Sequence, residues 1–225
     1  MEMIDTMDTD AAGSSAPDYA GAIWVAGPNH VDGRMGFPIR YIIIHGTGYP
    51  ETLDQYIAEG PKTGGVHYMV GKDGRIVQFV READASWGNG KVETGAEAFW
   101  RAWRTTDAAT MTIPGVVNPN LTSISIEHEK HARDNSDLLT AAQQEASFRL
   151  CAYLARKYRI PARRANGTDG GFASHASMEP VTRSFCPGPF PWEALFAYLH
   201  SAGCASVPQG WSDDGTALRA PALRP

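Results

Sequence analysis

Apolar residues recur in short runs along the first two thirds of the chain, and these runs predict strands. Four runs rich in β-branched residues occur at 41–45, 66–70, 76–80 and 124–127. A short apolar run without alternation is typical of a strand buried on both faces. The second and third runs flank an Asp-Gly pair at 73–74, which is a signal for a β-hairpin.

Three other stretches have the features of helices. Thr52 begins a sequence with the form of a capping box, which predicts a short helix from that point. A longer helix is predicted over about 140–158, where apolar residues recur four positions apart, and a final amphipathic helix over 192–199. The order of strands and helices predicts an α/β domain with a mixed central β-sheet flanked by helices.

Composition divides the chain into one domain and two tails. Residues 1–17 are acidic, small and polar and are expected to be disordered, whereas 201–225 are rich in Pro, Gly and Ala and are expected to form a tail. The formal net charge of −5, without a basic block, argues against nucleic acid as a partner of the domain at 18–200. No apolar run is long enough to cross a bilayer, so we expect no membrane insertion, and we expect a monomer.

His45 is the first candidate functional residue, because it stands where the most apolar strand gives way to a Gly-rich loop. The same ring could instead be satisfied by a backbone carbonyl. His175 and Cys186 lie farther along the chain, eleven residues apart in one predicted loop. Imidazole and thiolate are both good zinc ligands, and a catalytic zinc takes three protein ligands with water in the fourth position. Taken alone, Cys186 could equally be a small buried hydrophobe and His175 a solvated loop residue.

Four blocks of sequence carry a resemblance to a known family. They are IIIHGTG, GGVHYMVGKDGRIVQFV, NLTSISIEHE and SHASMEPVTRSFCPGPFPW, and the resemblance that they carry covers about residues 18–200. In this order they resemble the type-2 N-acetylmuramoyl-L-alanine amidases, the zinc amidase fold shared by phage lysozyme-type amidases and peptidoglycan recognition proteins. The resemblance implies Zn²⁺ bound by His45, His175 and Cys186, with Glu127 as the catalytic acid.

The implied reaction is hydrolysis of the amide between the muramic acid lactyl group and L-alanine of the peptidoglycan stem peptide. Zinc lowers the pKa of water to about 7 and polarises a carbonyl, and a nearby carboxylate can move the water's proton to the leaving amine. Glu127 could instead be a surface salt-bridge residue near Glu129 and Lys130. Two other functions remain open: a non-catalytic peptidoglycan-binding recognition module, against which Cys186 argues, and a structural domain with a metal-free triad.

The resemblance also marks residues for the oxyanion and departs from the family there. Many members carry Lys or Thr two residues before the third ligand, where this sequence has Ser184. We expect Arg183 to supply the positive charge and Ser184 to act in a secondary role. The alternative is that Arg183 only anchors its loop to Glu179 or another acid.

Other polar and aromatic residues have two interpretations each. His67 is a candidate for lining the substrate cleft or for the core. The aperiodic stretch from 81 to about 121 holds Trp87, Trp100 and Trp103, which could pave a groove for the glycan or stem peptide or could anchor the loop. We take Trp87 and His67 as the substrate-binding candidates.

Three further expectations complete the sequence-based account. The stretch EHEKH at 127–131 lacks the spacing of helical zinc proteases and is expected to be a solvated loop. Three cysteines do not make a disulfide framework, although a bond between Cys151 and Cys204 remains open. The protein is expected to act on the cell wall. The acidic N-terminus has no signal-like apolar region. The protein could therefore be a phage endolysin released from the cytoplasm or an exported chain lacking its signal.

Overall fold

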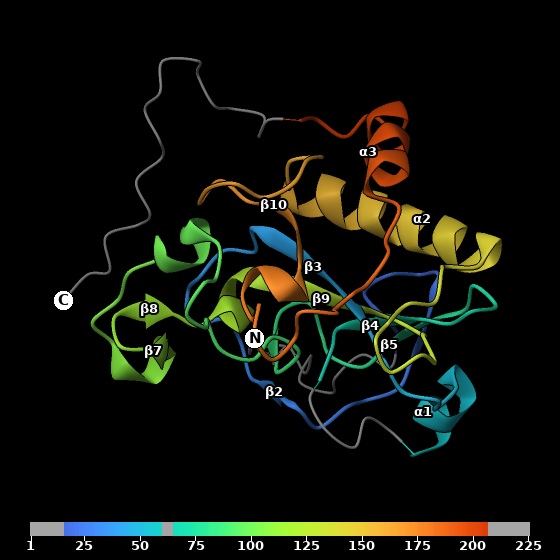
Figure 1. Ribbon diagram of the computed structural model, residues 1–225, viewed down its shortest axis with the longest axis horizontal. Coiled ribbons are helices and arrows are strands. Elements are labelled where there is room, and N and C mark those ends of the chain that lie inside the picture. The colour runs from blue at the N-terminus through green and yellow to red at the C-terminus, as the bar shows by residue number, and fades with distance from the viewer. Residues whose placement is uncertain (1–15, 60–64, 207–225) are drawn as a thin grey trace, which may run out of the picture.

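The computed structural model describes residues 16–59 and 65–206 (Figure 1). The tail expected at 1–17 lies almost wholly outside the described residues. So does most of the tail expected at 201–225, of which Ser201 ends the last helix. Within the described part of the chain, no helix is both long enough and apolar enough to span a bilayer.

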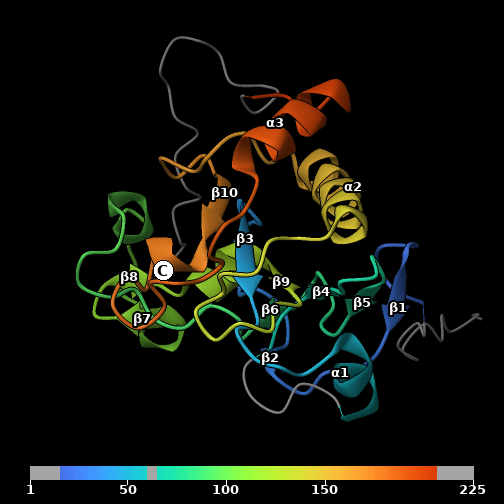
Figure 2. The same cartoon turned by 45° about the vertical axis from the view of Figure 1, so that its right-hand side comes forward.

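A six-stranded mixed sheet forms the centre of the fold, as the sequence predicts. In spatial order its strands are β1 (Ala22–Trp24), β5 (Ile76–Gln78), β4 (Tyr68–Val70), β9 (Ser123–His128), β3 (Tyr41–Gly46) and β10 (Gly171–Ser174). Figure 2 shows these strands side by side. The hairpin of β4 and β5 is the antiparallel pair, and every other neighbouring pair in this sheet is parallel. The carboxyl ends of β4, β9, β3 and β10 therefore meet at one edge.

Two helices cover one face of this sheet, α2 (Ala141–Tyr158) and α3 (Trp192–Ser201) (Figures 1 and 2). The side chains at even positions of the central strands, such as Ile42 and Ile44, pack with Leu150 and Leu154 of α2 in one buried cluster. Thr140 caps α2 by accepting a hydrogen bond from the Gln143 amide, as a helix start requires. The apolar residues that recur four positions apart in this helix therefore form the side of α2 that packs on the sheet.

The opposite face is covered mainly by irregular chain. Tyr41 and Ile43, at odd positions of β3, pack against Trp100 and Trp103 from the aperiodic stretch, while the short helix α1 (Leu53–Glu59) contributes Leu53 to a smaller cluster beside the hairpin. The irregular layer contains β2 (His30–Val31), β6 (Ala85–Ser86), η1 (Ala98–Arg101), η2 (Ala108–Thr110), β7 (Met111–Ile113), β8 (Val116–Val117), η3 (Pro119–Thr122) and η4 (His175–Ser177).

Two of the three tryptophans in this stretch are anchors of the loop. Trp100 and Trp103 are 1% and 9% exposed. The Trp103 indole donates a hydrogen bond to the Tyr41 hydroxyl at 2.7 Å, and the Trp100 indole donates to the Ser177 hydroxyl at 2.9 Å. These contacts tie the aperiodic stretch to the sheet and to the loop that carries His175. They leave neither ring free to pave a surface groove.

The expectation of a solvated loop at 127–131 is wrong. His128 continues β9 into the interior, where its ring nitrogens contact the His45 carbonyl oxygen at 2.9 Å and the Ser147 hydroxyl at 2.8 Å. Lys130 is 0% exposed, and its ammonium donates to three backbone carbonyls, those of Asn135, Pro187 and Pro189. A buried ammonium is tolerated here because all three of its hydrogens have acceptors.

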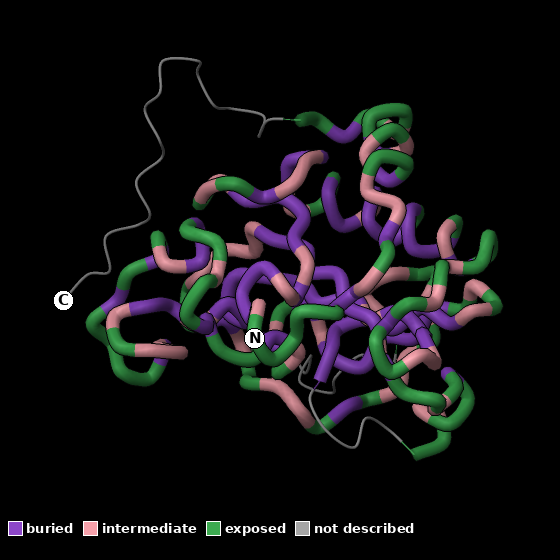
Figure 3. Tube along the Cα trace, in the orientation of Figure 1, coloured by how far each residue is buried: buried purple, intermediate pink, exposed green. Residues whose placement is uncertain are grey.

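Burial is concentrated in the strands of the sheet and the segments that cover them (Figure 3). The three cysteines are free and buried, so Cys151 and Cys204 do not form the disulfide that the sequence left open. Cys151 belongs to the core cluster beneath α2, as expected.

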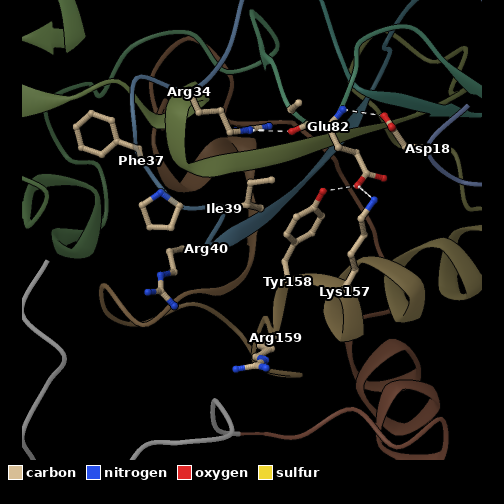
Figure 4. Close-up of a pocket in the computed structure, with 11 residues that line it drawn as sticks. Asp18, Arg34, Phe37, Ile39, Arg40, Glu82, Lys157, Tyr158 and Arg159 are labelled. Atoms are coloured by element: carbon tan, nitrogen blue, oxygen red, sulfur yellow. Dashed lines mark hydrogen bonds and ion pairs between the residues drawn. The ribbon is translucent and has the colours of Figure 1, made fainter. Parts of the chain in front are cut away.

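A concavity near the opposite end of β3 is lined by residues that form hydrogen bonds and ion pairs with one another (Figure 4). Buried Glu82 accepts hydrogen bonds there from the Lys157 ammonium and the Tyr158 hydroxyl, while the Arg34 guanidinium donates to the Glu82 carbonyl at 2.9 Å. The buried charges of Glu82 and Arg34 thus have partners within the protein. The candidate site lies instead at the carboxyl edge of the parallel strands.

Candidate metal centre

Three parallel strands bring two of the candidate ligands and the candidate acid to one edge of the sheet. His45 is the fifth residue of β3, and His175 follows β10 directly. Glu127, on β9, is the register partner of His45 across the β3–β9 pair. Residues paired in register on parallel strands point to the same face of the sheet, so Glu127 and His45 share the face covered by the irregular layer.

The two histidines and the cysteine converge closely. One ligand atom from each of His45, His175 and Cys186 lies within 4.8 Å of the others, and all three residues are buried. The two histidine Nδ1 atoms are 3.0 Å apart. Nitrogen ligands of a tetrahedral zinc lie about 3.3 Å apart, given the usual zinc–nitrogen distance. The Gly46 amide donates to Cys186 Sγ at 3.4 Å, which holds the sulfur beside the end of β3.

The hydrogen-bond network around His45 leaves the correct nitrogen free for a metal. The His45 Nε2 atom lies 3.0 Å from the Asn89 side-chain oxygen, which can only accept a hydrogen bond. Nε2 must therefore carry the ring hydrogen, and Nδ1 has a lone pair directed at His175 and Cys186. A donor set of one preset imidazole, a second imidazole and a thiol fits a metal ion.

A carboxylate, and not an amide as at His45, lies near the Nε2 atom of His175. Its Nε2 atom is buried without a hydrogen bond and lies 3.7 Å from a carboxylate oxygen of Glu179. Glu179 is itself held by the Lys91 amide at 2.5 Å and the Thr182 hydroxyl at 3.0 Å. An acceptor behind a ligating histidine orients the ring and raises its basicity, so Glu179 is suited to support metal binding by His175.

Burial sets the protonation states of the three candidate ligands. It lowers the pKa of His45 well below the ordinary histidine value and lowers that of His175 to about 4, so both rings are neutral at neutral pH. Burial also raises the pKa of the Cys186 thiol to about 12, and the nearby charge of Glu127 adds to this effect. A bound cation would stabilise the thiolate that burial disfavours, whereas the neutral histidines are already in the ligand form.

Glu127 is half-buried and has the features of a proton carrier. Burial raises its pKa to about 8, against which the Arg183 charge acts. Within the described residues its carboxylate forms no ion pair or hydrogen bond, because Glu129 pairs with His131 and Lys130 is occupied by carbonyls. The alternative of a surface salt bridge to Lys130 is therefore not realised.

Arg183 makes the contact with Glu179 that a loop anchor would make, and its positive charge also acts on the cluster. Its guanidinium lies 3.7 Å from Glu179, and its charge also lowers the pKa of both histidines, Glu127 and Cys186. The Cys186 amide donates to the Arg183 carbonyl at 2.9 Å, so the chain turns here and neighbouring side chains do not alternate as in a strand. Ser184 is exposed and lines a concavity with Trp192 and Cys186.

The two substrate-binding candidates lie in contrasting environments. His67 is 0% exposed, and its ring nitrogens contact the Arg34 guanidinium at 2.8 Å and the Ser86 hydroxyl at 3.0 Å. It is therefore a core residue, the second of the two interpretations left open for it. Trp87 is 52% exposed and remains available to a ligand.

Sequence reasoning missed Asn89 and did not assign Glu179 to His175. Asn89 stands between Gly88 and Gly90, and a Cβ atom at Gly90 would lie 1.9 Å from a Glu179 carboxylate oxygen. An asparagine between two glycines, inside an aperiodic stretch, is the local signal that could have identified this position.

A mixed sheet that presents two histidines and a cysteine at its carboxyl edge, with an acid one strand away, defines a candidate metal-dependent hydrolase. The chain belongs to the N-acetylmuramoyl-L-alanine amidase family, whose sequence model matches residues 35–189. This range includes all of the candidate residues, from His45 to Cys186. A comparison with curated protein sequences gives no match.

Solved structures resemble the fold. The amidase LysC from Clostridium intestinale URNW is 20% identical over 80% of this chain and 97% of its own, with a TM-score of 0.50. The endolysin amidase LysCS from the same organism is 21% identical over 83% of this chain and 99% of its own, also with a TM-score of 0.50. The hydrolase AmiA from Staphylococcus aureus, solved with its ligand, is 15% identical over 82% and 85%, with a TM-score of 0.50. At these identities the likeness concerns the fold alone.

Proposed function

We propose that this protein is a zinc-dependent N-acetylmuramoyl-L-alanine amidase that acts on cell-wall peptidoglycan. The observation that carries the proposal is the convergence of His45, His175 and Cys186, whose ligand atoms lie within 4.8 Å of one another. Family membership supplies the substrate class, and the donor set of two imidazoles and one thiol is suited to zinc.

The reaction divides between the metal and the residues around it. Zinc, when bound, would supply a Lewis acid that polarises the scissile carbonyl and lowers the pKa of water to about 7. Glu127 accepts a proton from the attacking water and passes it to the amine nitrogen as the carbon–nitrogen bond breaks. Its register beside His45 supports both roles, and its raised pKa of about 8 suits the protonated form that passes the proton to the amine.

The charge that develops on the carbonyl oxygen needs a second donor. Arg183 is the candidate for two reasons. Its positive charge lowers the pKa of both histidines, of Glu127 and of Cys186, and its side chain is 57% exposed. Ser184 has a neutral hydroxyl that can donate one hydrogen bond but adds no charge. Arg183 therefore takes the main oxyanion role in this proposal, with Ser184 secondary.

Exposed aromatic and apolar side chains are available for the rest of the substrate. Trp87, two residues before Asn89, is 52% exposed, and Phe185, directly before Cys186, is 64% exposed. Sugar rings and peptide side chains both pack on such surfaces. Trp87 is therefore retained as a substrate-binding residue, whereas the buried His67 is not.

The direct experiment is digestion of purified peptidoglycan with the zinc-loaded protein, followed by detection of newly released L-alanine amino groups. We expect new alanine amino ends and no new reducing sugar ends. A protein that binds peptidoglycan and zinc but releases no amino ends would be a recognition module, which is the second candidate function. New reducing ends in place of amino ends would contradict the proposal by assigning the cleavage to a glycosidic bond.

A further inference from the structure

We propose that Asn89 is a positioning residue that sets the tautomer of His45 before any metal binds. The inference rests on the proposed function for its biological meaning, but the contacts that carry it are independent of activity. Asn89 is 1% exposed, and its side-chain oxygen lies 3.0 Å from His45 Nε2.

The orientation of the Asn89 amide follows from a neighbouring hydroxyl. Ser123 donates its single hydroxyl hydrogen to the Pro119 carbonyl at 2.8 Å. The same hydroxyl can then only accept from Asn89, whose Nδ2 atom lies 2.7 Å away. The amide nitrogen of Asn89 is therefore turned toward Ser123, and its oxygen is turned toward His45.

Other contacts hold Asn89 in place. Its backbone amide donates to the Asn120 side-chain oxygen at 2.9 Å, and the Asn120 side-chain nitrogen donates back to the Asn89 carbonyl at 2.7 Å. The Ser125 hydroxyl donates to the Asn89 side-chain oxygen at 3.3 Å. The pairing with Asn120 fixes the backbone of Asn89, and the contacts with Ser123 and Ser125 fix its side chain, so the side-chain amide cannot turn over without breaking buried hydrogen bonds.

The consequence for His45 is a preset lone pair. With Asn89 oxygen as the acceptor, His45 carries its hydrogen on Nε2, and Nδ1 is bare and faces His175 and Cys186. The opposite amide orientation would present hydrogens to Nε2 and favour hydrogen on Nδ1, the nitrogen that must bind metal. Asn89 thus removes the cost of shifting the tautomer when the ion binds.

The test is long-range ¹H–¹⁵N NMR of the imidazole nitrogens in the metal-free full chain, together with zinc affinity measured by competition with a chelator. In the parent protein we expect His45 to carry hydrogen on Nε2. In Asn89→Leu, which is similar in size but has no acceptor, we expect Nδ1–H to appear and zinc affinity to fall by about tenfold to a hundredfold. Asn89→Asp keeps an acceptor and should restore both properties to within a few-fold of the parent.

Two further variants separate positioning from general damage to the fold. Thr110→Val removes a buried hydroxyl in the same irregular layer, without contact to either histidine, and should leave the tautomer and the zinc affinity unchanged. Ser123→Ala frees the Asn89 amide to turn and should give a partial shift toward Nδ1–H, which is also measurable if Asn89→Leu does not fold. The proposal is overturned if Nε2–H persists at parent zinc affinity in Asn89→Leu or Ser123→Ala, or if Thr110→Val weakens zinc equally. Failure of amide hydrolysis alone would overturn the proposed function and leave this inference standing.

Discussion

The two faces of the central sheet are built from different kinds of sequence. On one face, even-numbered strand residues such as Ile42 and Ile44 pack against the regular helix α2. On the other, odd-numbered residues such as Tyr41 and Ile43 pack against irregular chain anchored by Trp100. His45 continues the odd series, so the candidate metal centre belongs to the irregular face.

This difference shows which contacts fix the positions of the candidate metal ligands. A helix packed on a sheet needs only apolar residues at the helical period, and many combinations of apolar residues meet this requirement. The irregular face supplies individual polar contacts instead, such as Asn89 to His45 and the Lys91 amide to Glu179 behind His175. Substitutions on the two faces should therefore separate stability from chemistry.

The largest expected effect comes from removing a ligand on the irregular face. Alanine in place of His45, His175 or Cys186 should abolish amide hydrolysis and reduce bound zinc to background, because a catalytic zinc held by two remaining ligands is bound weakly. Metal analysis and the release of amino ends measure both effects. Circular dichroism should show that the sheet and α2 persist, and a variant that keeps zinc and full activity would remove its residue from the centre.

The next effect in size concerns the acid on the neighbouring strand. Glu127→Gln keeps the shape of the side chain but removes the proton carrier, so we expect retained zinc and a loss of kcat of about 10²–10⁴. Glu127→Asp serves as the matched variant that keeps the carboxylate. Turnover of the Gln variant within a few-fold of the parent would make Glu127 structural.

A smaller effect is expected at the oxyanion. Arg183→Ala should lower kcat by about 10²–10³, since a preorganised donor of this kind commonly contributes about 2.7–4 kcal/mol. Arg183→Lys should recover part of this loss because it keeps the charge, and Ser184→Ala should cost less than Arg183→Ala. If the loss appears only in Ser184→Ala, the hydroxyl is the donor and Arg183 is scaffold.

The smallest effect on chemistry should come from the regular face. Leu150 of α2 is 0% exposed, so Leu150→Ala should lower the free energy of unfolding by about 2–5 kcal/mol through the cavity it leaves. Zinc affinity and kcat per folded molecule should stay within about twofold of the parent. Denaturant titration measures the first quantity, and a large change in kcat at temperatures where the variant is folded would mean that the faces are coupled.

Sequence reasoning succeeded where a period or a motif was present. The hairpin around Asp73-Gly74, the strand ending in His45 and the helix capped by Thr140 follow from local patterns, and all three are found in the structure. The family resemblance, which the family match confirms, predicted that His175 and Cys186 lie beside His45, which is far away in sequence, and the three residues do lie together.

What the sequence did not reveal depends on contacts between irregular segments. In the sequence, His128 and Lys130 have the features of a charged loop. Each is nevertheless buried, because its side-chain nitrogen makes a hydrogen bond with a backbone carbonyl of a distant or neighbouring segment. Asn89 has no periodic neighbour, and its role depends on Ser123, which is far away in sequence. Such pairings join residues that are far apart in the chain, so no local pattern encodes them.

The most direct test of the central claim is a titration of zinc into the metal-free protein while amino ends are released from purified peptidoglycan. If His45, His175 and Cys186 form the single catalytic metal site, activity should rise in proportion to added zinc and level off at one equivalent per chain. The same titration of Cys186→Ala should give no rise at these concentrations. Full activity in metal-free protein kept under excess chelator would contradict the account.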